Sequence, residues 1–307
     1  MANLKQLSKI PERLSGGHRL CAGCGASIAV RQVLLGAGDS PVVVGCATGC
    51  LEVATTIYPY TAWRVPFIHN AFENVAATIS GVETAYRFFH KKGKIKQKIY
   101  FLAFGGDGGS YDIGIQSLSG ALERGHRMVY VCYDNEAYMN TGIQRSGATP
   151  QGASTTTTPA GKVKSGKMER RKDLTAICVA HRIPYVAQAT ISHWNDLVTK
   201  AQKAFAQDGP AFLNILSPCP RGWRFPSDKT VEIAKLAVET GFWPLYEVEE
   251  GKVKITYKPA RRKPIIEWLK SQGRYKHLFR PENEHIISAL QEDVDKQWER
   301  LEKGFLV

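Results

Sequence analysis

Hydrophobic segments rich in β-branched residues alternate along this chain with segments of helical periodicity. Val75, Ile79 and Val82 recur at the spacing of one helix face. Strands are predicted over 42–44, 99–104, 128–133, 184–188 and 211–216, and helices over 27–35, 71–89, 116–123, 171–181 and 192–206. Strands separated by helices predict an α/β fold, a mostly parallel sheet with helices on both faces.

Two parts of the chain break this alternation. Residues 146–169 are rich in Gly, Pro, Ser and Thr and have almost no apolar residues, so we expect a long loop that is either functional or mobile. Beyond about residue 250 the alternation weakens, and a last amphipathic helix is expected from Glu284. We therefore predict an α/β domain over 1–250 and a C-terminal extension over 251–307, which packs on that domain or on a partner.

Composition and charge narrow the possible partners. No apolar run approaches the roughly 18–20 residues of a membrane span, and the N-terminus has no apolar signal segment. The net charge is +13, with basic stretches at 162–172 and 258–263, but no nucleic-acid-binding motif accompanies them. We expect a cytoplasmic protein that binds neither membrane nor nucleic acid, with a basic surface that is solvated or contacts an acidic protein.

A glycine-rich motif follows the strand predicted over 99–104. Its sequence is Gly105-Gly106-Asp107-Gly108-Gly109, and Asn135 follows the next strand. Glycines let a backbone approach a diphosphate closely, while Asp107 and the Asn135 amide oxygen are hard ligands suited to Mg²⁺. Both lie at carboxyl ends of strands, where α/β sheets bind ligands. The alternative is a glycine-rich turn with an unrelated asparagine nearby.

The seven cysteines fall into two groups. Cys132 and Cys178 lie in apolar segments and are expected in the core. The others lie in turns flanked by glycine or proline: Cys21, Cys24, Cys46, Cys50 and Cys219. Four thiolates can bind zinc or a 4Fe–4S cluster. Their wide spacing along the chain favours the cluster, because structural zinc sites usually use two close pairs.

Six short motifs occur along the chain in a fixed order. They are GHRLCAGCG at 17–25, ATGCLEV at 47–53, IHNAFEN at 68–74, GGDGG at 105–109, YMNTG at 138–142 and SPC at 217–219. Together they resemble, over about residues 15–250, the beta subunit of pyruvate:ferredoxin oxidoreductase in the 2-oxoacid:ferredoxin oxidoreductase family. The resemblance implies the diphosphate-binding half of a thiamine-diphosphate fold. It also implies oxidative decarboxylation of a 2-oxoacid, with pyruvate expected, to CO₂ and acetyl-CoA, with coenzyme A as co-substrate and ferredoxin as electron acceptor.

The same resemblance implies roles for individual residues. The expected ligands of one 4Fe–4S cluster are Cys21, Cys24, Cys50 and Cys219, which leaves Cys46 spare. Those of Mg²⁺ are Asp107, Asn135 and the carbonyl of Ala137. Residues expected at thiamine diphosphate are Gly25, Gly106, Asp107, Gly108, Gly109, Asn135, Asn140 and Thr141. Asn140 is also expected to face the substrate as a catalytic residue.

Two positions depart from the family pattern. Ala26 stands where some relatives have a glutamate, which leaves a cofactor contact there open. Ile143 follows the Asn-Thr-Gly motif where relatives often have a small or polar residue. The substrate therefore stays open between pyruvate, 2-oxoglutarate and oxalate.

The chain is expected to be one part of a larger enzyme. The family's thiamine site needs a glutamate from a second α/β half, and the cysteines are too few for further clusters. We therefore expect an alpha subunit, a gamma/delta subunit or domain with more 4Fe–4S clusters, and ferredoxin as partners. Two alternatives remain: a thiamine enzyme without electron transfer, and a zinc-stabilised α/β binding protein.

Overall fold

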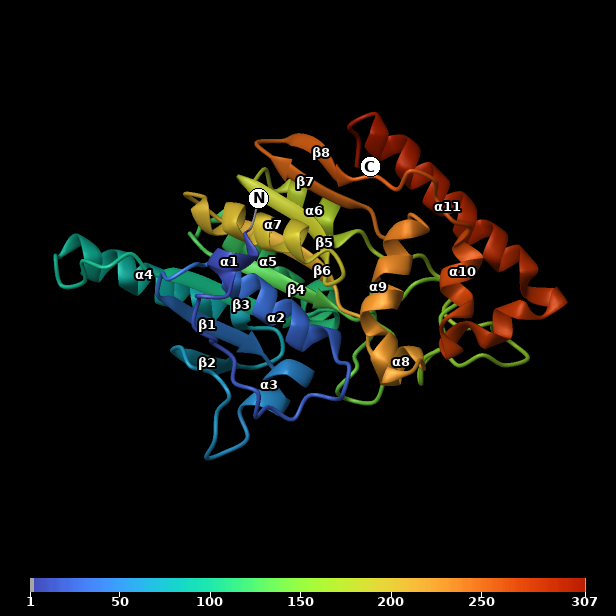
Figure 1. The fold of residues 1–307 in the computed structure, drawn as a ribbon, viewed down its shortest axis with the longest axis horizontal. Helices are drawn as coiled ribbons and strands as arrows, with labels where there is room; N and C mark the ends of the chain where they lie inside the picture. Colours follow the sequence, from blue (N-terminus) through green and yellow to red (C-terminus); the bar gives the residue numbers. More distant parts are fainter. Residues whose placement is uncertain (1–2, 307) are drawn as a thin grey trace.

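An eight-stranded sheet runs through the computed structural model, which describes residues 3–306 (Figure 1). Its strand order is β2-β1-β3-β4-β6-β5-β7-β8. The strands are β1 (Val42–Ala47), β2 (Phe67–Asn70), β3 (Tyr100–Gly106), β4 (Val129–Asp134), β5 (Tyr185–Thr190), β6 (Ala211–Leu216), β7 (Leu245–Glu249) and β8 (Lys252–Tyr257). Strands β1 to β6 are parallel, and β7 and β8 are antiparallel. The predicted fold class is confirmed.

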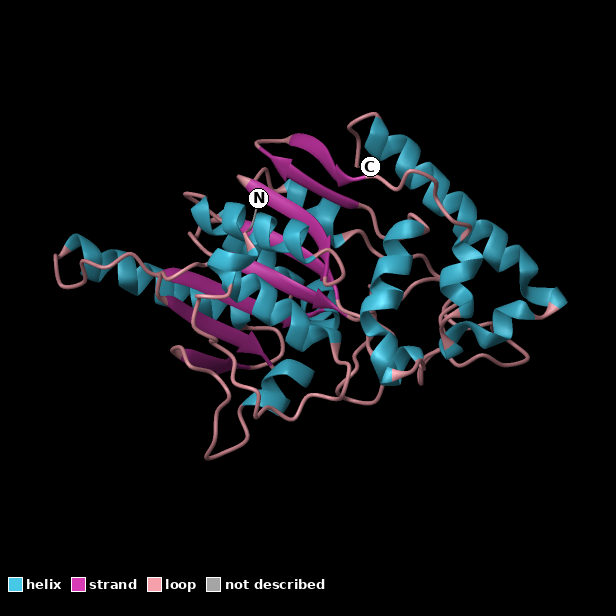
Figure 2. Ribbon diagram, in the orientation of Figure 1, coloured by secondary structure: helices cyan, strands magenta, loops and turns pink. Residues whose placement is uncertain are grey.

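Helices cover both faces of this sheet, as Figure 2 shows. Helices α2 (Gly25–Gly36) and α7 (Trp194–Ala206) pack together on one face. The other face is covered by α4 (Val75–Lys91), α5 (Ile115–Glu123) and α6 (Leu174–Ala180). Because strand side chains alternate between faces, Val131 and Tyr133 enter the first core while Tyr130 and Cys132 enter the second.

A third hydrophobic cluster lies beyond the carboxyl ends of the parallel strands, where Figure 1 shows helices α8 to α11. It contains Trp223, Trp243, Trp268 and Trp298, all nearly inaccessible to solvent. The elements here are α8 (Pro220–Trp223), η2 (Ser227–Lys229), α9 (Thr230–Glu239), α10 (Ile265–Lys270), η3 (Gly273–Phe279), η4 (Pro281–Asn283) and α11 (Glu284–Glu302). The helix predicted from Glu284 is confirmed.

The loop predicted over 146–169 contains neither helix nor strand. Its first part is nevertheless buried, and Lys167 holds it together from inside. Lys167 is 1% exposed, and its side-chain nitrogen donates to the carbonyl oxygens of Thr149 at 2.6 Å and Ser146 at 3.3 Å. The segment is therefore ordered by its own polar contacts, which replace the apolar residues that it lacks.

The remaining helices are α1 (Leu4–Leu7), α3 (Cys50–Thr55) and the π-helical η1 (Gly108–Ile113). None of the helices in residues 3–306 combines the length and the apolar character needed to cross a membrane.

Candidate functional site

The carboxyl ends of β3 and β4 border a cavity of about 260 Å³. The two strands are in register so that Gly106 lies beside Tyr133, which brings the residues that follow each strand together. The residues expected at thiamine diphosphate or Mg²⁺ line this cavity, apart from Gly25: Gly106, Asp107, Gly108, Gly109, Asn135, Ala137, Asn140 and Thr141. Segments that follow different strands thus meet at one point.

The three residues expected at Mg²⁺ are in direct contact. With the Asn135 amide turned so that its nitrogen donates, that atom lies 2.9 Å from Asp107 Oδ1 and 3.0 Å from the carbonyl oxygen of Ala137. The backbone N–H of Asn135 also donates to Asp107 Oδ1, at 3.3 Å. Mg²⁺ would bind this amide through its oxygen, so the amide would be turned the other way when the ion is bound. The Asp107 carboxylate, the Asn135 amide oxygen and the Ala137 carbonyl would then be three oxygen ligands of the kind that Mg²⁺ prefers.

Asp107 lies in surroundings that favour a cation beside it. Burial raises the pKa of its carboxyl well above the usual range, and the neighbouring Asp134 raises it further. The Ser146 hydroxyl, which donates to Asp107 Oδ2 at 2.5 Å, works against this shift. A bound divalent cation would supply the missing positive charge and keep the carboxylate ionised.

Gly108 is required by the shape of the cavity. A Cβ atom at this position would lie 2.5 Å from the ring of Tyr138. Tyr138 in turn packs against Phe72 with the two rings tilted and their centroids 5.5 Å apart, so this wall is aromatic. At the rim, Asn140 and Thr141 are exposed. Ile143 does not line the cavity.

The four cysteines expected at the cluster come from distant parts of the chain, and Cys24 and Cys50 lie near enough to Cys21 and Cys219 for the charges of their thiolates to interact. Burial raises the pKa of Cys24 to about 11, with repulsion from Cys219 and Cys21 adding to the shift. Burial also raises the pKa of Cys50 to about 12, with repulsion from Cys219, Cys24 and Cys21. The thiolates of Cys24 and Cys50 are thus destabilised by burial and by neighbouring cysteines, which bound iron would reverse.

Cys50 joins the two groups of residues, because it also lines the cavity beside Asp107. Cys46 is separate: it is fully buried in the first core, and its thiol contacts the adjacent Ala47 carbonyl. Cys132 and Cys178 are buried core residues, as predicted. Among residues 3–306, no three histidine, cysteine or carboxylate side chains converge on one metal-ion position. The metal and cluster ligands therefore remain predictions.

Gly25 lies outside the cavity and instead packs against the backbone of Ser217 and Pro218. It begins α2, and its N–H donates to the carbonyl of Pro218 at 3.2 Å. A Cβ atom here would lie 2.7 Å from the carbonyl carbon of Ser217. The absence of a side chain therefore lets the Cys21–Cys24 motif approach the segment that carries Cys219.

Sequence reasoning missed several residues of this region. Thr48, Gly49 and Met139 line the cavity, and their proximity to Cys50 and Asn140 in the sequence was the available signal. Glu136 was missed although it lies between Asn135 and Ala137. Its side chain is fully buried, which the sequence alone gives no reason to expect of a glutamate.

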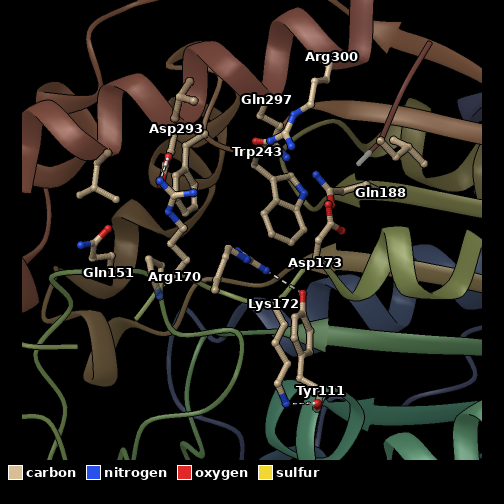
Figure 3. Close-up of a pocket in the computed structure, with 16 residues that line it drawn as sticks. Tyr111, Gln151, Arg170, Lys172, Asp173, Gln188, Trp243, Asp293, Gln297 and Arg300 are labelled. Atoms are coloured by element: carbon tan, nitrogen blue, oxygen red, sulfur yellow. Dashed lines mark hydrogen bonds and ion pairs between the residues drawn. The ribbon is translucent and has the colours of Figure 1, made fainter. Parts of the chain in front are cut away.

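Figure 3 shows a second cavity, of about 190 Å³, between η1 and α11. Gln297 and Arg300 approach it from α11, and Tyr111 approaches from η1. Two of its basic residues are already paired: Arg170 with Asp293 at 2.9 Å, and Lys172 with Asp112 at 2.6 Å. None of the predicted site residues lines it.

Comparison with known proteins identifies the family. Residues 43–215 match the family model of the thiamine pyrophosphate enzyme C-terminal TPP binding domain. The chain is 57% identical to pyruvate synthase subunit PorB of Thermotoga maritima, covering 97% of this chain and 95% of that one. Identity is 55% with PorB of Methanocaldococcus jannaschii, over 92% and 95%, and 45% with ketoisovalerate oxidoreductase subunit VorB of Pyrococcus furiosus, over 98% and 96%.

A solved structure shares the fold. It is the 2-oxoglutarate:ferredoxin oxidoreductase from Magnetococcus marinus, with a TM-score of 0.57 and 20% identity over 76% of this chain and 84% of that one. The predicted resemblance is confirmed: the chain belongs to the thiamine pyrophosphate-binding subunits of the 2-oxoacid:ferredoxin oxidoreductase family, together with the PorB subunits of pyruvate synthase.

Proposed function

We propose that this chain binds Mg²⁺–thiamine diphosphate and one 4Fe–4S cluster in an enzyme that oxidises pyruvate and reduces ferredoxin. The observation that carries the proposal is that Cys50 and Asp107 line one cavity. A cysteine beside the predicted metal residues provides an electron exit next to the cofactor. A thiamine enzyme without electron transfer and a zinc-stabilised binding protein would each leave one of these two features unused.

Each predicted residue has a task in this site. Asp107, Asn135 and the Ala137 carbonyl hold Mg²⁺, while Gly106 and Gly108 leave room for the diphosphate. Thiamine diphosphate supplies the carbon nucleophile and electron sink that decarboxylation needs. The chain orients it and limits water through the aromatic wall of Phe72 and Tyr138. Asn140 and Thr141, at the exposed rim, are available to contact substrate.

Pyruvate is proposed as the substrate because of the relatives' names. The pyruvate synthase subunit of Thermotoga maritima is 57% identical to this chain, whereas the ketoisovalerate oxidoreductase subunit of Pyrococcus furiosus is 45% identical. Coenzyme A is the proposed acyl acceptor, by analogy with the family.

The proposed partners are those that the site needs to be complete. An alpha subunit would cover the open rim at Asn140, and a chain with further clusters would carry electrons to ferredoxin. One predicted contact surface, residues 258–263, is partly occupied within the chain: Lys258 pairs with Glu302 at 2.6 Å and Lys263 with Glu239 at 2.7 Å. We place the enzyme in the cytoplasm, since reducing conditions preserve the free thiols.

The test uses the native complex purified without oxygen. Asp107→Ala should abolish pyruvate-dependent viologen reduction while iron and acid-labile sulfide stay at the wild-type level. Full activity in this variant would refute the metal role. Absence of iron, or of a brown chromophore near ~400 nm as thiolate-bound clusters show, in the wild-type complex would refute the cluster.

A further inference from the structure

Glu136 lies between Asn135 and Ala137, the two residues after β4 that are expected to bind Mg²⁺. We call residues 135–137 the metal loop. The backbone of Glu136 has a φ of 64°, in the left-handed region that residues with a side chain rarely adopt. Its side chain is completely buried. A glutamate stays in such a conformation only when its surroundings hold it there.

Two arginines from distant segments hold the Glu136 carboxylate. Arg171, at the end of the long loop, donates to Oε1 at 3.1 Å. Arg274, in η3 of the C-terminal segment, donates to Oε2 at 2.5 Å and is itself 2% exposed. The guanidinium of Arg171 also donates to Tyr111 at 2.7 Å and lies 4.8 Å from the ring centroid of Trp243. In Figure 3 Trp243 lies above Tyr111 at the same cavity.

The backbone around Glu136 is fixed by further contacts. Trp223 Nε1 donates to the carbonyl of Asn135 at 2.8 Å, and the Thr149 hydroxyl donates to the carbonyl of Glu136 at 2.7 Å. The Arg274 guanidinium lies over the Trp223 ring, 3.9 Å from its centroid. Hydrogen bonds thus hold the Asn135 carbonyl, the Glu136 carbonyl and the Glu136 carboxylate in place. The Asn135 amide and the Ala137 carbonyl face Asp107.

We propose that Glu136, Arg274 and Trp223 are positioning residues that aim the Asn135 amide and the Ala137 carbonyl at Mg²⁺. This inference rests on the proposed function. Through Arg274, the inference makes the C-terminal segment part of the cofactor site, although this segment lies outside the α/β domain that the sequence predicts. Groups that orient metal ligands in this way commonly contribute a factor of about 10–100 to metal affinity.

The arrangement also connects the two cofactor sites. Trp223 is the last residue of α8, and Cys219 caps the start of the same helix. A displacement of Trp223 would therefore move the metal loop and a predicted cluster ligand together.

The test measures binding of Mn²⁺ with thiamine diphosphate to the oxidised native complex by electron paramagnetic resonance. Arg274→Met should weaken Mn²⁺ binding at least about tenfold, and Arg274→Lys should recover part of the loss. Lys200→Met is the matched control, because Lys200 is another buried cation, 1% exposed and paired with Asp196 at 2.7 Å. It should lower Tm but leave Mn²⁺ affinity unchanged.

Trp223→Phe keeps an aromatic ring at this buried position, but it removes the indole N–H that contacts the Asn135 carbonyl together with part of the packing of the larger ring. It should weaken Mn²⁺ binding about fivefold, as expected for one hydrogen bond, and so tests the inference even if Arg274→Met does not assemble. Wild-type affinity in both Arg274→Met and Trp223→Phe would overturn the inference. Failure of the wild-type complex itself to bind Mn²⁺ with thiamine diphosphate would instead overturn the proposed function.

Discussion

Replacing Gly25 by alanine should destabilise the protein at the point where two cysteine segments meet. The added Cβ would lie 2.7 Å from the carbonyl carbon of Ser217 and 2.9 Å from the nitrogen and oxygen of Pro218. Carbon atoms normally pack at about 3.5–4.0 Å, so one backbone must move by about 1 Å. Neither contact is the flexible end of a side chain. Overpacking of this kind costs about 1–3 kcal/mol.

The movement would also separate Cys24 from Cys219, since each is adjacent in the chain to a clashing residue. We therefore expect Gly25→Ala to lower Tm by a few degrees and to reduce the iron content of the purified complex. Calorimetry and iron analysis measure both effects.

The matched control is Gly81→Ala in α4, where no atom lies within 4 Å of the added Cβ. Alanine is the better helix former by about 0.5–1 kcal/mol, so this variant should be slightly more stable and keep its iron. A Gly25→Ala complex with wild-type Tm and iron content would refute the reasoning.

Two further predictions concern single residues. Cys50→Ser should remove the cluster absorbance and iron, whereas Cys46→Ser should keep both, because Cys46 is buried in the core; equal iron loss in the two variants would contradict the ligand set. Burial lowers the pKa of Lys167 to about 8, against about 10.4 in an unfolded chain. The folded protein disfavours the protonated side chain relative to the unfolded chain. The stability that Lys167 contributes is therefore complete above pH ~10.4 and is lost as the pH falls through its pKa in the folded protein. The Tm difference between wild type and Lys167→Met should accordingly shift in favour of the wild type from pH 8 to 10, and a constant difference would contradict this.

The central strands could be predicted because a parallel sheet buries both faces, which leaves continuous apolar runs such as residues 129–133 of β4. Strand β2 was missed because it is a four-residue edge strand with a histidine and an asparagine. The β7–β8 hairpin was missed although β8 alternates lysines with apolar residues, which is itself the signal of a half-buried strand; this signal lay just past the expected boundary at residue 250.

The grouping of Asp107 with Asn135 was predictable, since both follow neighbouring parallel strands. The environment of Glu136 was not, because Arg274 lies 138 positions away in the sequence and only the folded chain brings the two charges together. Gly25 illustrates another limit. A motif indicates that glycine is needed, but only the fold shows that the neighbour is the Ser217–Pro218 backbone.

The most direct test of the proposed function is a substrate panel on the native complex, with viologen reduction measured in the presence and absence of coenzyme A. The panel contains pyruvate, 2-oxoglutarate, 2-oxobutyrate, oxalate and 2-oxoisovalerate. We predict that pyruvate gives the highest kcat/KM, that reduction depends on coenzyme A, and that Asp107→Ala eliminates it. A complex that decarboxylates pyruvate without reducing viologen, or that leaves pyruvate untouched, would contradict the account.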